Sequence, residues 1–145
     1  MGLSQEELVR LCIKLARYKK ENKELLNYLL FETGDEERYI NSIKEEVEKE
    51  FKAINKSSLY LAKKTIRRIL RLVKKYSKYS GHKETELELL IFFCQQLKET
   101  KLPIKDSKVL TNLYQRQIQT AKKALSTLHE DLQFDFKDHI TSLEL

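Results

Sequence analysis

The sequence predicts an all-α protein: a single-domain helical bundle, or a short stack of helical hairpins, with five to six helices. Three glycines and one proline occur in 145 residues, which leaves few sites for the tight turns of a strand-rich fold. Apolar residues recur at spacings of three and four along most of the chain, as on amphipathic helices. The length suits one domain covering residues 1–145, and 41% apolar residues can supply its core.

The first predicted helix covers residues 4–32. Ser4 with Glu7 has the pattern of a capping box, and Gly34 follows the end of the helix. A heptad seam runs along residues 8–29: Leu8, Leu11, Leu15, Tyr18, Asn22, Leu25 and Leu29. Two interpretations stay open. The seam joins two copies in a coiled-coil homodimer whose register Asn22 sets, or the helix packs inside the domain.

The next two predicted helices, residues 35–54 and 57–80, form a hairpin. The turn between them is short, so we expect the helices to pack antiparallel. The first helix of the pair carries a stripe of apolar residues flanked by glutamates. Ser57 or Ser58 caps the second, which ends near Gly81.

The helix at 57–80 has the clearest pattern in the chain. Its basic residues fall within an arc of about 140° on a helical wheel, and apolar residues occupy the other side. They are Lys63, Lys64, Arg67, Arg68, Arg71, Lys74, Lys75 and Lys78, and Tyr60 lies within the same arc. From Phe51 to Lys83 there are eleven lysines and arginines and no acidic residue. The net charge of +6 is therefore concentrated in this segment.

Three further helices are predicted. Residues 84–100 are apolar on nearly every side, which places this helix at the centre of the bundle; a strand over 89–94 is the alternative. After a loop at 101–105, a helix over 106–129 has an apolar stripe and a polar face that includes Arg116 and Lys123. A short helix over 131–143 closes the chain, although Leu132, Phe134 and Phe136 alternate as in a strand.

Few residues suggest catalysis. Asp131, Asp135 and His139 are spaced by four and would share one helical face, but no HExxH pattern accompanies them. Cys12 and Cys94 have no CxxC spacing, and no glycine-rich nucleotide-binding loop is present. We therefore expect no catalytic residues, no metal site and no cofactor. With no leader pattern and no membrane span expected, the predicted location is cytoplasmic.

The sequence therefore predicts a non-enzymatic binding or interaction module that uses the basic helix, residues 63–78, to engage an anionic partner. That partner is an acidic protein or a nucleic acid. In a competing interpretation, the basic face is only a solvated surface, or glutamates of the helix at 35–54 neutralise it. Two alternative functions remain: a purely structural or oligomerisation role, and a metal-dependent enzyme that uses the acidic, histidine-containing C-terminal stretch.

Overall fold

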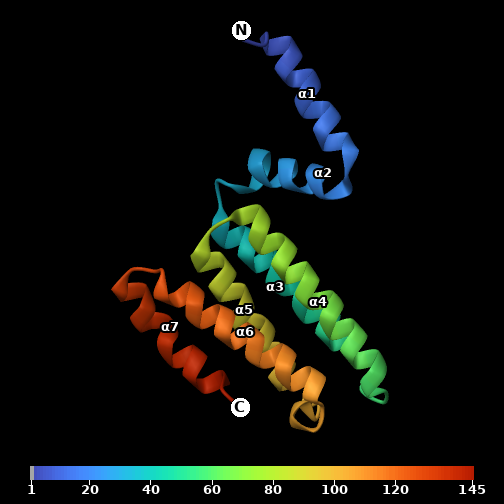
Figure 1. Ribbon diagram of the computed structural model, residues 1–145, viewed down its shortest axis with the longest axis vertical. Coiled ribbons are helices and arrows are strands. Elements are labelled where there is room, and N and C mark those ends of the chain that lie inside the picture. The colour runs from blue at the N-terminus through green and yellow to red at the C-terminus, as the bar shows by residue number, and fades with distance from the viewer. Residues whose placement is uncertain (1) are drawn as a thin grey trace. The chain divides into compact units, whose positions relative to one another are not determined.

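A computed structural model describes residues 2–145. In this part of the chain there are seven α-helices and no strand, so the predicted all-α class is confirmed, with more helices than the expected five to six (Figure 1). The chain divides into two compact units, Met1–Glu36 and Glu37–Leu145. That the chain acts as a single domain stays a prediction.

The N-terminal unit contains α1 (Gln5–Tyr18), α2 (Lys20–Asn27) and one turn of π-helix (Tyr28–Glu32). Ser4 caps α1, because its hydroxyl accepts a hydrogen bond from the backbone N–H of Glu7 at 3.1 Å. The cap agrees with the start predicted for the first helix. Neither α1 nor α2 has a buried residue.

The predicted continuous helix over 4–32 is wrong, because the chain is extended at Lys19, with φ −139° and ψ 150°. The side-chain amide of Asn22 donates to the carbonyl of Leu15 at 2.7 Å. The backbone N–H of Asn22 donates to the carbonyl of Lys19 at 3.1 Å. Asparagine side chains compete in this way with helical backbone hydrogen bonds. Asn22 therefore bridges the interruption, and the heptad run does not lie on one helix.

The C-terminal unit consists of five helices: α3 (Glu36–Lys52), α4 (Leu59–Ser80), α5 (Lys83–Glu99), α6 (Lys108–Ser126) and α7 (Glu130–Leu143). A short 3₁₀ turn, Ile104–Asp106, precedes α6. α3 and α4 lie side by side (Figure 1). Arg68 of α4 pairs with Glu50 near the end of α3, whereas the carbonyl of Tyr76 accepts from Tyr39 near its start. These contacts confirm the antiparallel hairpin.

Helix α4 begins and ends near the predicted residues. Ser58 caps it by accepting from the N–H of Leu61 at 3.3 Å. Gly81 stops it in the left-handed conformation, with φ 71°, which residues other than glycine rarely adopt. The basic helix is therefore fixed at both ends by local sequence.

Helix α5 lies at the centre of the C-terminal unit, as predicted, and contacts α4, α6 and α7. Its buried apolar residues are Leu87, Leu89, Leu90, Ile91, Phe93, Cys94 and Leu97. The ring of Phe93 lies 5.5 Å from that of Phe51 of α3. The strand alternative for 89–94 is excluded, because these residues are helical.

Helices α6 and α7 complete this unit. Ser107 caps α6 through a hydrogen bond from the N–H of Leu110 at 3.3 Å. The buried hydroxyl of Tyr114 donates to the carbonyl of Leu143, and the amine of Lys98 donates to the carbonyl of Ser142 at 3.0 Å. These bonds hold the end of α7 against α5 and α6. The closing segment is therefore a helix and not a strand.

Candidate anion-binding surface

The basic residues of α4 lie at the surface. Lys63 and Lys75 are half-buried, and the other members of the predicted set are exposed: Lys64, Arg67, Arg68, Arg71, Lys74 and Lys78. The opposite side of α4 is buried through Ala62, Ile66, Ile69 and Val73. The helix therefore uses its apolar face for the core and leaves the basic face accessible to solvent.

Helix α3 neutralises only part of this face. Arg68 donates to the carboxylate of Glu50 at 2.6 Å. Within residues 2–145 no carboxylate lies within ion-pair distance of the remaining exposed basic residues of α4, which are Lys64, Arg67, Arg71, Lys74 and Lys78. Among the exposed basic residues of α4, the ion pair with α3 therefore involves Arg68.

Two tyrosines contact lysines of α4. The amine of Lys64 lies 4.7 Å from the ring centroid of Tyr60, and that of Lys75 lies 5.1 Å from the ring centroid of Tyr76. Tyr60 is 65% exposed. The predicted association of Tyr60 with the basic residues is present at the start of the helix.

The structure adds a second row of basic side chains that the sequence prediction did not include. A surface groove of about 330 Å³ runs between α4 and α6, lined by Arg67 and Lys74 from α4 and by Asn112 and Arg116 from α6. A neighbouring hollow adds Ser77, Lys78 and Thr120. Lys74 also lines a third hollow, which reaches Lys123 of α6. Lys74 lines all three hollows, and we call the three together the α4–α6 groove. Two carboxylates also line it, Glu86 and Glu144, and each pairs with a further lysine, Lys83 and Lys122 respectively. The cations without such a partner are called the α4–α6 groove cations: Arg67, Lys74, Lys78, Arg116 and Lys123.

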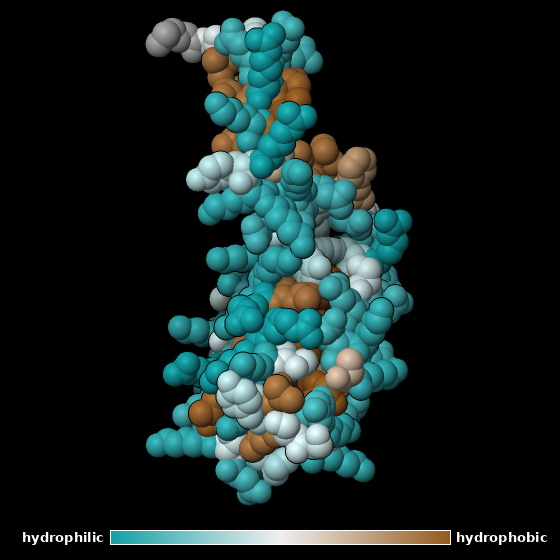
Figure 2. Space-filling view, turned by 90° about the vertical axis from the view of Figure 1, so that its right-hand side faces the viewer, coloured by the Kyte–Doolittle hydropathy of each residue, from teal (hydrophilic) through white to brown (hydrophobic). Residues whose placement is uncertain are grey.

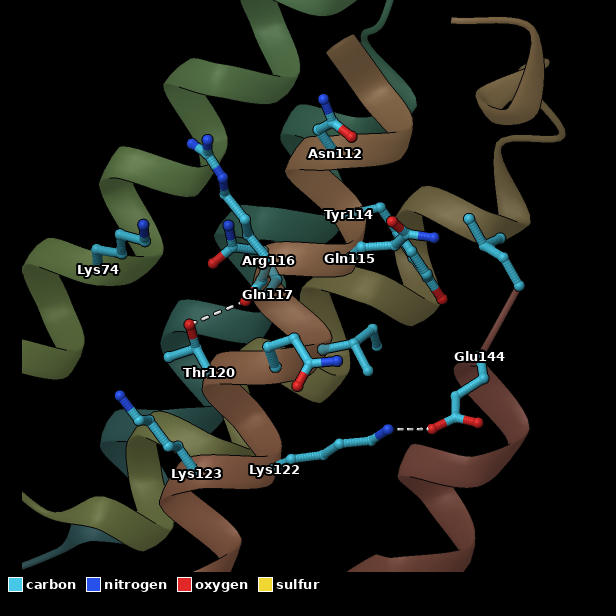
Figure 3. Close-up of a pocket in the computed structure, with 13 residues that line it drawn as sticks. Lys74, Asn112, Tyr114, Gln115, Arg116, Gln117, Thr120, Lys122, Lys123 and Glu144 are labelled. Carbon is cyan, nitrogen blue, oxygen red and sulfur yellow. Dashed lines mark hydrogen bonds and ion pairs between the residues drawn. The ribbon is translucent and has the colours of Figure 1, made fainter. Parts of the chain in front are cut away.

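Figure 3 shows three of these cations, Lys74, Arg116 and Lys123. Arg116 and Gln117 reach from α6 toward α4, where Lys74 lies, and Lys123 lies on the same side of α6. Lys122 points the other way and pairs with Glu144 (Figure 3). Ion pairing therefore neutralises Lys122, whereas Arg116 and Lys123 have no carboxylate within ion-pair distance in the described part of the chain.

The groove also has buried polar atoms. Gln117 is 3% exposed, and its amide nitrogen donates to the carbonyl of Leu113 at 3.1 Å. The amide oxygen of Gln117 and the hydroxyl of Ser77 make no hydrogen bond within residues 2–145. Buried polar atoms are almost always hydrogen-bonded, so these two atoms are exceptions in the described part of the chain.

Other sites considered in the sequence do not assemble. Asp131, Asp135 and His139 are exposed on α7, and across residues 2–145 no three acidic, histidine or cysteine side chains are close enough to hold one metal ion. Burial raises the pKa of the Cys94 thiol to about 12, so it stays protonated at neutral pH. Cys12 is exposed on α1.

Comparison with protein families, curated proteins and solved structures finds no match to this chain. Among the described helices none is both long and apolar enough to cross a bilayer. The physical features of the α4–α6 groove are therefore the basis for assigning a function.

Proposed function

We propose that this protein is a non-enzymatic binding module that contacts the phosphate groups of a nucleic acid through the α4–α6 groove. One observation carries the proposal: exposed cations without carboxylate partners line one groove from two adjacent helices. Charge runs on single helices are often only solvated surfaces. A groove with basic residues on both walls can hold a chain of negative charges between them.

The dimensions and chemistry of the groove suit a phosphate backbone. Arg67 and Lys78 are eleven residues apart on α4, which is about 16 Å along the helix axis. That length spans several phosphates of a nucleic-acid strand. The guanidinium groups of Arg67 and Arg116 can each bind two phosphate oxygens at once. The side-chain amide of Asn112 adds a hydrogen-bond donor that does not depend on base sequence, whereas the hydroxyl of Thr120 already donates to the carbonyl of Arg116 at 2.9 Å.

The binding expected from such a groove depends on shape and charge rather than on base sequence. Phosphate contacts position a protein on nucleic acid without reading it. The exposed ring of Tyr60 can stack on an unpaired base, which favours single-stranded segments. We therefore propose binding to single-stranded DNA or RNA with weak sequence preference.

A titration tests this function. Labelled mixed-sequence DNA and RNA are titrated with Arg67→Glu/Arg116→Glu protein and with wild type, at low and near-physiological salt. The control Lys105→Glu/Lys137→Glu changes the net charge equally at exposed residues outside the groove. We expect salt-sensitive binding that the groove variant loses and the control keeps.

Two results would contradict the proposal. Wild type that binds no oligonucleotide at low salt would remove nucleic acid as the partner and leave an acidic protein as the ligand of the groove. Equal loss of binding in both variants would show that overall charge, and not the α4–α6 groove, determines the affinity.

A further inference from the structure

Of the three hollows of the α4–α6 groove, one is also lined by α5. It has a volume of about 390 Å³, within the range of about 300–1,000 Å³ that is common for small-molecule sites. Lys74 and Lys78 line it from α4 and Leu90 from α5, and Gly81 brings in the turn between these helices. The hollow of about 330 Å³ is lined from α4 and α6 alone. We call the first one the α4–α5 hollow. Because the turn bounds it at the C-terminal end of α4, it suits the end of a ligand better than a chain that continues.

The hydroxyl of Ser77 also lines the α4–α5 hollow. Ser77 is 8% exposed, and its Oγ makes no hydrogen bond within residues 2–145. Hydroxyls on other helices of this protein donate to a carbonyl of the preceding turn. That of Ser42 donates to Tyr39 at 2.7 Å, and that of Thr120 donates to Arg116 at 2.9 Å. A serine proton can turn toward an acceptor. Ser77 therefore offers a ligand a donor that no atom of the described chain uses.

The charges around the α4–α5 hollow favour an anion. Lys74 and Lys78 are four residues apart, so they lie on the same side of α4. Both are exposed, and in the described chain neither has a carboxylate within ion-pair distance. Glu86 also lines the hollow, but its carboxylate lies 3.2 Å from the amine of Lys83. With three lysines and one glutamate in its lining, the hollow has an excess of two positive charges.

The surface of the C-terminal unit is also suited to a charged ligand. On the face that Figure 2 shows, hydrophilic side chains predominate in this unit, and apolar ones lie among them in small groups. Large exposed apolar patches are the usual sign of an apolar partner. A small charged group is therefore a better match to this face than an apolar surface.

We propose that the α4–α5 hollow binds a phosphomonoester, either the terminal phosphate of a nucleic-acid strand or the phosphate of a free nucleotide. A phosphomonoester carries a charge of about −1.5 to −2 at pH 7 and has three acceptor oxygens. A phosphate within a strand carries one negative charge. The amines of Lys74 and Lys78 and the hydroxyl of Ser77 supply one donor group for each of three oxygens. For a strand end the inference rests on the nucleic-acid binding proposed above, whereas for a free nucleotide it does not.

The preference for a strand end tests the proposal. Internally labelled single strands of mixed sequence carry a 5′-phosphate, a 3′-phosphate or hydroxyls at both ends. Fluorescence anisotropy gives the affinity of each strand for the full chain as wild type, Ser77→Ala and Lys78→Gln. We expect wild type to prefer one phosphorylated end by about tenfold, since one hydrogen bond to a charged group has about that effect. Each variant is expected to lose the preference.

Matched controls lie outside the groove. Ser42→Ala removes a helical hydroxyl from α3, and Lys105→Gln removes one charge from an exposed position. Neither residue lines the groove, so both variants are expected to keep the wild-type preference. Urea unfolding gives a second measurement. Because the hydroxyl of Ser77 has no partner in the described chain, Ser77→Ala is expected not to lower the midpoint. A lower midpoint would show that this hydroxyl serves the fold, and it would overturn the role assigned to Ser77.

A nucleoside 5′-monophosphate and the corresponding nucleoside distinguish the two sources of the phosphate. In calorimetric titrations of wild type we expect binding of the nucleotide alone, weakened about tenfold by Ser77→Ala or Lys78→Gln. An end preference without nucleotide binding supports the strand end as the ligand, and the reverse result supports a free nucleotide.

Failure of this site and failure of the proposed function give different results. If strands bind with no end preference and the nucleotide does not bind, the phosphomonoester site is overturned and nucleic-acid binding by the groove stands. If no strand binds but the nucleotide binds and depends on Ser77 and Lys78, the proposed function fails and the phosphomonoester site remains.

Discussion

The position of Arg67 in the groove predicts how binding responds to salt. Arg67 and Arg68 are neighbours on α4, and both are exposed. Arg67 lines the α4–α6 groove, whereas Arg68 is held 2.6 Å from Glu50 of α3. Replacing either arginine with glutamine lowers the net charge by one. A difference between the two variants therefore reports a contact and not a change in overall charge.

The size of the salt effect on affinity follows from the number of phosphate contacts. For single strands each neutralised phosphate contributes about 0.7 to the slope of log K against log salt. The five α4–α6 groove cations then give a slope of about −3.5, so binding weakens about 130-fold between 50 and 200 mM salt. In Arg67→Gln protein we expect a shallower slope of about −2.8, so that affinity decreases about 50-fold over the same salt range. Arg68→Gln is expected to leave the slope near the wild-type value.

Fluorescence anisotropy with a labelled single strand at five or more salt concentrations measures these slopes. Circular dichroism of each variant confirms that the helices are intact. A special role of the groove is refuted if Arg68→Gln reduces the size of the slope as much as Arg67→Gln does. A slope near zero for wild type would also refute it, because phosphate contacts always release counterions.

Three further outcomes test the buried residues of α5 and the C-terminal end of α4. At pH 8 a thiol reagent should label only Cys12, because the pKa of buried Cys94 is about 12, and both should react in urea. Phe93→Ala should lower the free energy of unfolding by about 3–5 kcal/mol in urea titrations, since the side chain is fully buried. Gly81→Ala should cost about 1 kcal/mol, measured in the same way, because φ is 71° there; no change would contradict the left-handed stop.

Much of the fold could be predicted because local sequence determines it. Ser4, Ser58 and Gly81 mark helix ends through their own side chains or backbone freedom, so their effect is visible in a short window. The apolar residues on nearly every side of α5 predicted its central position, because a helix that is apolar all round is buried by its neighbours.

The break at Lys19 was not predicted, because the heptad spacing continues through it and a single asparagine decides the local geometry. Asn22 was identified as the unusual residue in the seam, but the heptad spacing does not show that its side-chain amide donates to the carbonyl of Leu15. Spacing alone does not distinguish a polar seam residue from one that hydrogen-bonds to the backbone.

The candidate surface was predicted only in part. The basic face of α4 is visible on a helical wheel, but its second wall is not. Arg116 and Lys123 were recognised as members of a polar face, yet nothing local indicates that this face lies beside α4. The pairing of Arg68 with Glu50 also depends on helix neighbours. Tertiary packing therefore determined which basic residues act together.

The side-chain bond of Asn22 has a consequence for the length of the N-terminal segment. An unbroken helix over residues 5–32 would extend about 42 Å, whereas the interruption divides it into two short rods. In Asn22→Leu protein the amide that holds Leu15 is gone and the apolar spacing is continuous, so one straight rod becomes the favoured form. A single amide group thus sets how far this segment reaches.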